Sequence, residues 1–240
     1  MSSRNKLDNQ LHIAEVEYEG KTFQFLNNSR QDHIQKVLNS GSFYEIEELE
    51  LIRKYAPKAN RLLDVGANIG NHTIFLAHML DLELAIPIEP QPAVQIPLRA
   101  NIGLNWHRSF DLGYLGIGLG QETGTAIISR FSEKNLGGTQ LSLQRSIETS
   151  TQDETIQVHS GDYLFPNYHF DLIKIDAEGM ELQIIKGLRK NLEKFGGVVF
   201  LEVLDQNAED LSRLVDEIGL TIVSEYRRYA RCTNWLLKRL

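Results

Sequence analysis

The sequence contains a single cysteine, Cys232, and it lacks long apolar runs and any excess of basic charge. One cysteine excludes an intrachain disulfide and a cysteine-based zinc site, so we expect Cys232 to be a small core residue. No stretch approaches the roughly 18 apolar residues of a membrane helix, and residues 1–8 are too polar for a signal peptide. The 25 basic and 32 acidic residues give a net charge of −7, which does not attract phosphate backbones or anionic lipids. We therefore expect a cytoplasmic protein without nucleic-acid or membrane partners.

Repeats and linkers rich in proline, glycine or serine are also absent, so composition marks no domain boundary. A chain of 240 residues, 42% of them hydrophobic, can bury one substantial core. Alternation of apolar and polar residues over 12–26 predicts a hairpin, and helical spacing over 31–56 predicts two short helices. We expect residues 1–60 to form a small N-terminal lobe of the same domain. Residues 61–240 would form its main part, with an inserted flap at about 118–160.

The main part alternates short apolar strands with helices, a pattern typical of a parallel sheet that is covered on both faces. Two later apolar segments, 220–227 and 233–238, predict an antiparallel pair. The expected fold is therefore α/β, with a seven-stranded, mostly parallel sheet that ends in a C-terminal antiparallel hairpin. The parallel strands are predicted at 62–65, 84–88, 112–117, 170–176 and 197–204.

The first of these strands runs into a glycine turn, residues 64–70 (Asp-Val-Gly-Ala-Asn-Ile-Gly). Ligands of open parallel sheets bind outside the carboxyl ends of the strands, so this turn is a candidate binding element. Its G-x-x-x-G spacing differs from the G-x-G-x-x-G pattern of pyrophosphate binders. Gly66 permits a close backbone approach, Gly70 permits tight helix packing, and free N–H groups there suit the carboxylate of a bound amino acid. The alternative is an ordinary strand-to-helix turn.

Glu89 follows the second strand, 25 positions after Asp64. A carboxylate at this place can accept hydrogen bonds from both hydroxyls of a ribose; its alternative role is a solvated charge at a strand end. Together with the glycine turn, Glu89 indicates an adenosine-containing ligand without a pyrophosphate, and S-adenosylmethionine fits this description. We expect its ribose to be bound by Glu89 and its methionine end by Gly66, Asn68 and Gly70. Asp64 is a further candidate cofactor-binding residue.

An acidic segment, residues 174–181 (Lys-Ile-Asp-Ala-Glu-Gly-Met-Glu), follows the fourth strand. A carboxylate there can take a proton from an attacking hydroxyl, an effect of about 10²- to 10⁴-fold in rate. Acids at a helix N-terminus can also merely complement the helix dipole, which we consider the main role of Glu181. Glu202, after the fifth strand, adds a carboxylate, but no complete ligand set for Mg²⁺ is visible and we predict no metal. The candidate catalytic residues are Asp176, Glu178 and Lys174.

Four segments occur in one order along most of the chain: 43–45 (Phe-Tyr-Glu), 64–70, Glu89-Pro90 with Leu98 and Asn101, and 173–181. In this order they resemble the FkbM family of methyltransferases. The last segment is the most specific, because the general methyltransferase fold does not require it. The resemblance implies a Rossmann-like class I methyltransferase fold. It also implies methyl transfer from S-adenosylmethionine to oxygen, often to a hydroxyl of a sugar, glycan or other secondary metabolite.

Two features depart from the family pattern. Ser160-Gly161-Asp162-Tyr163 stands where the family commonly has Leu-Asp-Asp, and Pro97 interrupts the helix after Glu89. The resemblance nevertheless implies that Asp162 contacts the adenine side of the cofactor.

Alternatives to O-methylation rest on the same residues. A non-catalytic binding module would keep the cofactor motifs without turnover, and N- or C-methylation stays open because the sequence does not show which atom attacks. An NAD-dependent oxidoreductase conflicts with the missing G-x-G-x-x-G pattern. We expect a small-molecule or glycan acceptor to contact the N-terminal lobe and residues 118–160, where Asn135 with Gly137-Gly138 is a candidate rim. His72, next to the glycine turn, is read as a structural residue, since lone histidines are more often structural than catalytic.

Overall fold

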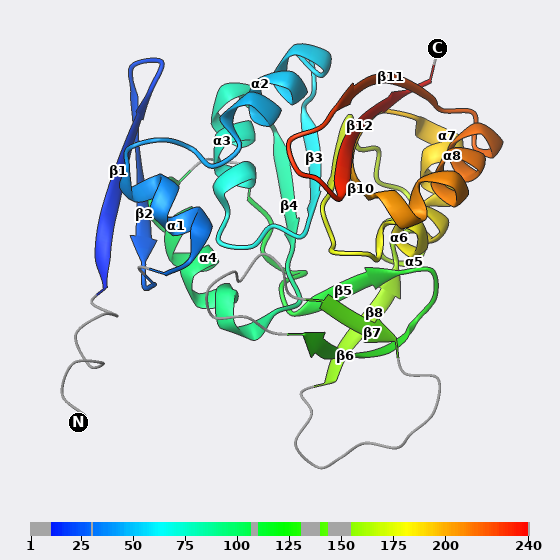
Figure 1. The fold of residues 1–240 in the computed structure, drawn as a ribbon, viewed down its shortest axis with the longest axis horizontal. Helices are drawn as coiled ribbons and strands as arrows, with labels where there is room; N and C mark the ends of the chain where they lie inside the picture. Colours follow the sequence, from blue (N-terminus) through cyan, green and yellow to red (C-terminus); the bar gives the residue numbers. More distant parts are fainter. Residues whose placement is uncertain (1–10, 30, 107–109, 131–139, 144–154, 240) are drawn as a thin grey trace.

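The computed structural model describes residues 11–29, 31–106, 110–130, 140–143 and 155–239. Its strands form three sheets, and helices flank the largest of them (Figure 1). None of the helices within these ranges is long and apolar enough to cross a membrane.

The central sheet has six strands in the order β11-β12-β10-β9-β3-β4. The strand β12 (Cys232–Lys238) follows the others in sequence, but it lies between β10 and β11 (Thr221–Tyr226) and runs antiparallel to both. The predicted parallel sheet with a C-terminal antiparallel hairpin is thus confirmed. Pro87 lies in the outermost strand of this sheet, where a missing N–H donor is tolerated. The parallel strands are β3 (Arg61–Val65), β4 (Leu84–Ile88), β9 (Leu172–Ile175) and β10 (Val198–Leu204).

The strand predicted at 112–117 does not form, and the central sheet has six strands rather than seven in the described ranges. The chain turns there instead: the Asp111 side chain accepts the Gly113 N–H at 2.9 Å, and Gly116 adopts a φ of +89°. Beyond β4, the described residues add only an isolated parallel bridge between Ala85 and Phe110.

A second sheet contains the segment that we predicted as an inserted flap. Its four strands have the order β5-β8-β6-β7, with β5 parallel to β8 and β6 antiparallel to both of its neighbours. It lies beside one end of the central sheet, at the bottom of Figure 1. The candidate rim at Asn135 and Gly137-Gly138 lies outside the described residues. The strands are β5 (Ile117–Gly120), β6 (Gly124–Arg130), β7 (Gln140–Leu143) and β8 (Thr155–Ser160).

Helices pack on both faces of the central sheet, and strand side chains alternate between the two layers. In β3, Leu62 belongs to the buried cluster of the first layer, while Leu63 and Val65 belong to that of the second. Burial on both faces is what a continuous apolar strand predicts, so the α/β architecture is confirmed. The first layer contains α2 (Ile46–Tyr55), α3 (Asn71–Met79) and α4 (Pro92–Leu104). The second contains α6 (Glu181–Gly187), α7 (Arg189–Phe195) and α8 (Ala208–Glu217).

The N-terminal segment forms the predicted hairpin, β1 (His12–Tyr18) and β2 (Lys21–Asn27), followed by α1 (His33–Asn39) and α2. Two asparagines of the α4 region bond the free edge of β2. Leu26 N–H donates to Asn101 Oδ1 at 2.6 Å, and Gln24 N–H donates to Asn105 Oδ1 at 2.9 Å. Because these side chains satisfy the strand edge, the hairpin is held against α4 and shares its apolar cluster.

Lys174 lies inside the sheet, paired in register with Asp64 across β9 and β3. Its Nζ is 3.4 Å from Asp64 Oδ1 and 3.6 Å from Asp176 Oδ2, and it donates to the Gly66 carbonyl oxygen at 3.0 Å. Asp64 is fully buried and also accepts the Thr73 hydroxyl. Burial alone lowers the pKa of Lys174, but the charges of Asp64 and Asp176 outweigh it and raise that pKa above its ordinary value. The buried ammonium therefore ties the glycine turn to the acidic segment.

Gly66 is expected to be essential for stability. It adopts a φ of +78°, and a Cβ there would lie 1.8 Å from the Asp176 carbonyl oxygen. Gly66→Ala should lower the free energy of unfolding by more than about 2 kcal/mol, because it adds a backbone clash to the conformational strain. Gly20, in the β1–β2 turn, has a similar φ of +76° with nothing within 4 Å, so Gly20→Ala should cost only about 1 kcal/mol. Urea denaturation measures both; equal losses would contradict the close approach.

Removing the Lys174 ammonium is expected to destabilise the fold. Lys174→Met should lower the free energy of unfolding by about 3–5 kcal/mol at neutral pH, because Asp64 is left as an unpaired buried charge. Lys186→Met, at an exposed position of α6, is the matched control and should change it by less than about 0.5 kcal/mol. Adding Asp64→Asn to Lys174→Met should restore part of the loss. A denaturation midpoint that is the same for both lysine variants would refute this role.

Candidate functional site

A cavity of about 800 Å³ lies at the carboxyl ends of the parallel strands. Its wall combines residues that follow β3, β4 and β9 with residues from β10, from the segment between α1 and α2, and from the loop between β11 and β12. Ligands of open parallel sheets bind at this edge, so the cavity is the candidate site.

The glycine turn forms the wall next to β3. The N–H groups of Gly66 and Ala67 both donate to the Ile88 carbonyl oxygen, at 3.0 and 3.1 Å, and Asn68 N–H donates to Glu89 Oε2 at 2.8 Å. The free N–H groups expected from the sequence are therefore not found at these three positions, because the turn is bonded to the end of β4. Gly66 and Asn68 still line the cavity through their remaining surface.

Glu89 is buried, with 6% of its surface exposed, and it lines the cavity. Its two carboxylate oxygens accept the N–H groups of Asn68 and Gln91, each at 2.8 Å. Burial raises its pKa to about 7, although these two hydrogen bonds lower it. Each carboxylate oxygen can accept a further hydrogen bond, so Glu89 retains capacity for hydroxyl donors from a ligand.

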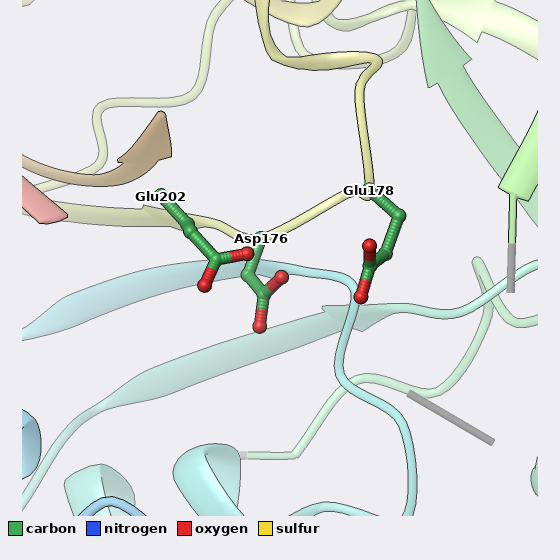
Figure 2. A group of neighbouring side chains, drawn as sticks. All are labelled: Asp176, Glu178 and Glu202. Carbon is green, nitrogen blue, oxygen red and sulfur yellow. The ribbon is translucent and has the colours of Figure 1, made fainter. Parts of the chain in front are cut away.

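Three carboxylates that also line the cavity cluster together, as Figure 2 shows. Asp176 and Glu178 follow β9, Glu202 lies in β10, and oxygen atoms from the three lie within 4.8 Å of one another. The charge of Asp176, together with burial, raises the pKa of Glu202. Cys232 donates from its thiol to Glu202 Oε1 at 3.2 Å. The predicted burial of Cys232 is confirmed, and its contact with the cluster is new.

The cluster has the oxygen chemistry that Mg²⁺ prefers, but three carboxylates are only part of a near-octahedral set. Water and substrate oxygens would have to complete it. The same three groups can equally accept protons or hydrogen bonds from hydroxyls of a substrate.

A second group of polar side chains, centred on Glu45, also lines the cavity. It was not predicted from the sequence as part of the site. Glu45, which precedes α2, accepts the Tyr229 hydroxyl at its Oε1 at 3.0 Å, and its Oε2 lies 3.5 Å from His72 Nε2. The Tyr44 and Tyr229 hydroxyls are 2.7 Å apart. All four residues line the cavity. Burial and the charge of Asp176 raise the pKa of Glu45 to about 7.

An ion-pair cluster fastens the β11–β12 loop beside this group. The Arg228 guanidinium pairs with Glu47 and Glu48 at the start of α2. Glu48 is fully buried, so the pair also neutralises a charge that has no access to water. The loop that carries Tyr229 is thereby held against α2.

Two of the predicted cofactor residues lie behind the cavity wall. Asp64 is paired with Lys174 beneath the glycine turn. Gly70 directly precedes α3 and has a φ of +91°, and a Cβ there would lie 2.9 Å from Leu98 Cδ1. Neither residue lines the cavity. Their places in the structure indicate support of the turn, and the tight helix packing inferred for Gly70 agrees with this contact.

Asp162 lies in α5 (Gly161–Leu164), also outside the cavity lining. Its carboxylate oxygens accept the N–H groups of Lys190 and Asn191 at 3.0 and 2.9 Å. Asp162 therefore caps the N-terminus of α7, and both of its oxygens are engaged. This placement does not support the adenine contact implied by the family resemblance.

Comparison with known proteins places the chain in a family. The family model described as the methyltransferase FkbM domain matches residues 64–229. The hexuronic acid methyltransferase AglP of Haloferax volcanii is 25% identical over 177 residues, which are 74% of this chain and 70% of that protein.

Two solved structures share the fold. The FkbM methyltransferase of Methylobacillus flagellatus KT gives a TM-score of 0.53 at 18% identity, over 75% of this chain and 44% of that one. An rRNA methylase of Streptococcus thermophilus gives a TM-score of 0.50 at 11% identity, over 81% of this chain and 95% of that one. The chain thus spans less than half the length of the first structure. Because the family model covers most of the chain, including the glycine turn, Glu89 and the acidic segment, this protein belongs to the FkbM family of methyltransferases.

Proposed function

We propose that the cavity binds S-adenosylmethionine and that the protein transfers its methyl group to an acceptor oxygen, a hydroxyl of a sugar, glycan or other secondary metabolite. The observation that carries this proposal is the buried carboxylate of Glu89, which lines the same cavity as Asp176 and Glu178. Glu89 would accept hydrogen bonds from the ribose hydroxyls. Gly66 and Asn68 would contact the methionine end of the cofactor.

The acceptor oxygen would attack the sulfonium methyl in line, and most of the acceleration would come from holding the two reactants together. Asp176 or Glu178 would accept the hydroxyl proton as the oxygen attacks. Lys174, whose Nζ is 3.6 Å from Asp176 Oδ2, would keep that carboxylate in position. This is the catalytic contribution that we assign to Lys174.

Two observations support a sugar or glycan acceptor. One relative is named a hexuronic acid methyltransferase, and a hexuronic acid is a sugar acid. Polar side chains from residues 1–60, Tyr44 and Glu45, line the same cavity as the glycine turn. We therefore propose that these residues act as a lobe of the catalytic domain that contacts the acceptor.

Glu89→Ala is expected to abolish S-adenosylmethionine binding in calorimetry, because the ribose hydroxyls lose their acceptor. Glu83→Ala, at an exposed position just before β4, is the matched control and should bind normally. For the wild type, affinity should weaken as the pH falls below about 7, since protonation of Glu89 removes the charged acceptor. The assignment fails if the wild type does not bind the cofactor or if Glu89→Ala binds it equally well.

Asp176→Asn is expected to lower the rate of S-adenosylhomocysteine release by about 10²- to 10⁴-fold, because the proton acceptor is lost. Cofactor affinity should be nearly unchanged. Glu209→Gln, at an exposed position of α8, serves as a control for a lost carboxylate. The assay is a screen of hydroxylated acceptors with an amine panel alongside. Turnover of amines only would refute O-methylation, and cofactor binding without turnover of any acceptor would favour the non-catalytic module.

A further inference from the structure

Glu45 is held in an unfavourable backbone conformation at the cavity wall. Its φ of +57° lies in the left-handed region, which costs free energy in a residue other than glycine. Asn71 fixes the preceding residue: Tyr44 N–H donates to Asn71 Oδ1 at 3.0 Å, and Asn71 Nδ2 donates to the Tyr44 carbonyl oxygen at 2.9 Å. This strained turn is therefore bonded to the first residue of α3, and it places the Glu45 side chain in the cavity wall.

His72 follows Asn71 and also lines the cavity, with only 8% of its side chain exposed. Its Nε2 has no hydrogen-bond partner among the described residues, and it lies 3.5 Å from Glu45 Oε2. Burial, together with the charge of Lys174, lowers the pKa of His72 far enough to keep the imidazole neutral. A buried polar atom without a hydrogen bond lowers the stability of the fold, unless a ligand supplies the missing hydrogen bond.

One hydroxyl group on the cavity side can bridge these two side chains, because an oxygen beside the 3.5 Å gap can lie about 2.8 Å from both atoms. If His72 Nε2 carries the proton, it donates to the hydroxyl oxygen, and the hydroxyl donates to ionised Glu45. If Nε2 is bare, the hydroxyl donates to His72 and accepts from protonated Glu45. Both arrangements satisfy every donor and acceptor, whereas a carboxylate in this place would face the charge of ionised Glu45.

The pair shares its cavity with the proposed methyl-acceptor position, since Glu45, His72 and Asp176 all line it. Lys174 lines the same cavity, and its charge acts on all three of these side chains. A molecule with two neighbouring hydroxyls could contact both at once.

We propose that Glu45 and His72 form a subsite for a second hydroxyl of the acceptor, adjacent to the hydroxyl that is methylated. The acceptor class is therefore a vicinal diol, as in a sugar ring. This inference rests on the proposed O-methyl transfer. Tyr229 is a positioning residue in it, since its hydroxyl holds Glu45 Oε1 and leaves Oε2 facing His72.

The test compares methyl hexopyranosides with their monodeoxy analogues as acceptors, with S-adenosylhomocysteine release as the readout. The wild type should turn over the best diol at least about 100-fold more efficiently than the analogue that lacks the neighbouring hydroxyl. Glu45→Gln and His72→Phe should lose most of this preference, because their turnover of the diol falls. Their turnover of the deoxy analogue should stay near the wild-type value. Glu50→Gln, within α2 and outside the cavity lining, should keep the preference.

Calorimetry with S-adenosylmethionine and thermal unfolding of each variant complete the experiment. Unchanged cofactor affinity in Glu45→Gln and His72→Phe supports an acceptor subsite, whereas its loss would assign the pair to the cofactor and overturn the inference. Equal turnover of diol and deoxy analogue by the wild type would also overturn it, as would turnover of simple alcohols but of no hexopyranoside. In those cases the proposed function survives, because methyl transfer to oxygen is still observed.

Discussion

The buried ammonium of Lys174 is the interaction on which the geometry of this site depends. Asp64 has no access to water and would be an uncompensated charge without it. The same ammonium contacts the Gly66 carbonyl oxygen and approaches Asp176, so it links the glycine turn to the acidic segment. In the proposed function these two elements lie beside the cofactor and the acceptor, and methyl transfer requires the two reactants at a set separation.

The strands and helices around this centre follow from local sequence. The segments Leu62–Val65 and Leu172–Ile175 are mostly apolar, and both are buried strands in the sheet. Their one charged residue each, Asp64 and Lys174, is buried as an ion pair. The segment 112–117 is apolar as well, yet the Asp111 turn and the positive φ of Gly116 end any strand there. A prediction that counts only apolar residues therefore placed a strand where the turn residues favour a turn.

Some residues of the candidate site could also be predicted from the sequence, and others could not. The place of Glu89, Asp176 and Glu178 on the cavity wall was predictable because each lies within three residues of the end of a parallel strand, and such positions meet at one edge of the sheet. Glu45 and Tyr229 are 184 positions apart and meet only through packing of the two ends of the fold. The one sequence signal for this group was the segment Phe43-Tyr44-Glu45. Asp162 was expected at the site, but its side chain instead accepts hydrogen bonds from the N-terminus of α7. No motif in the sequence indicated this contact.

The strand order β11-β12-β10 has a consequence for how the enzyme is made. β12 is the last strand in the chain, yet it lies inside the sheet, so during synthesis β10 keeps an open edge until β12 has left the ribosome. The loop with Tyr229 and the thiol of Cys232 arrive at the same late stage. Because both residues line the cavity, a nascent chain whose sheet still lacks β12 has an incomplete cavity wall.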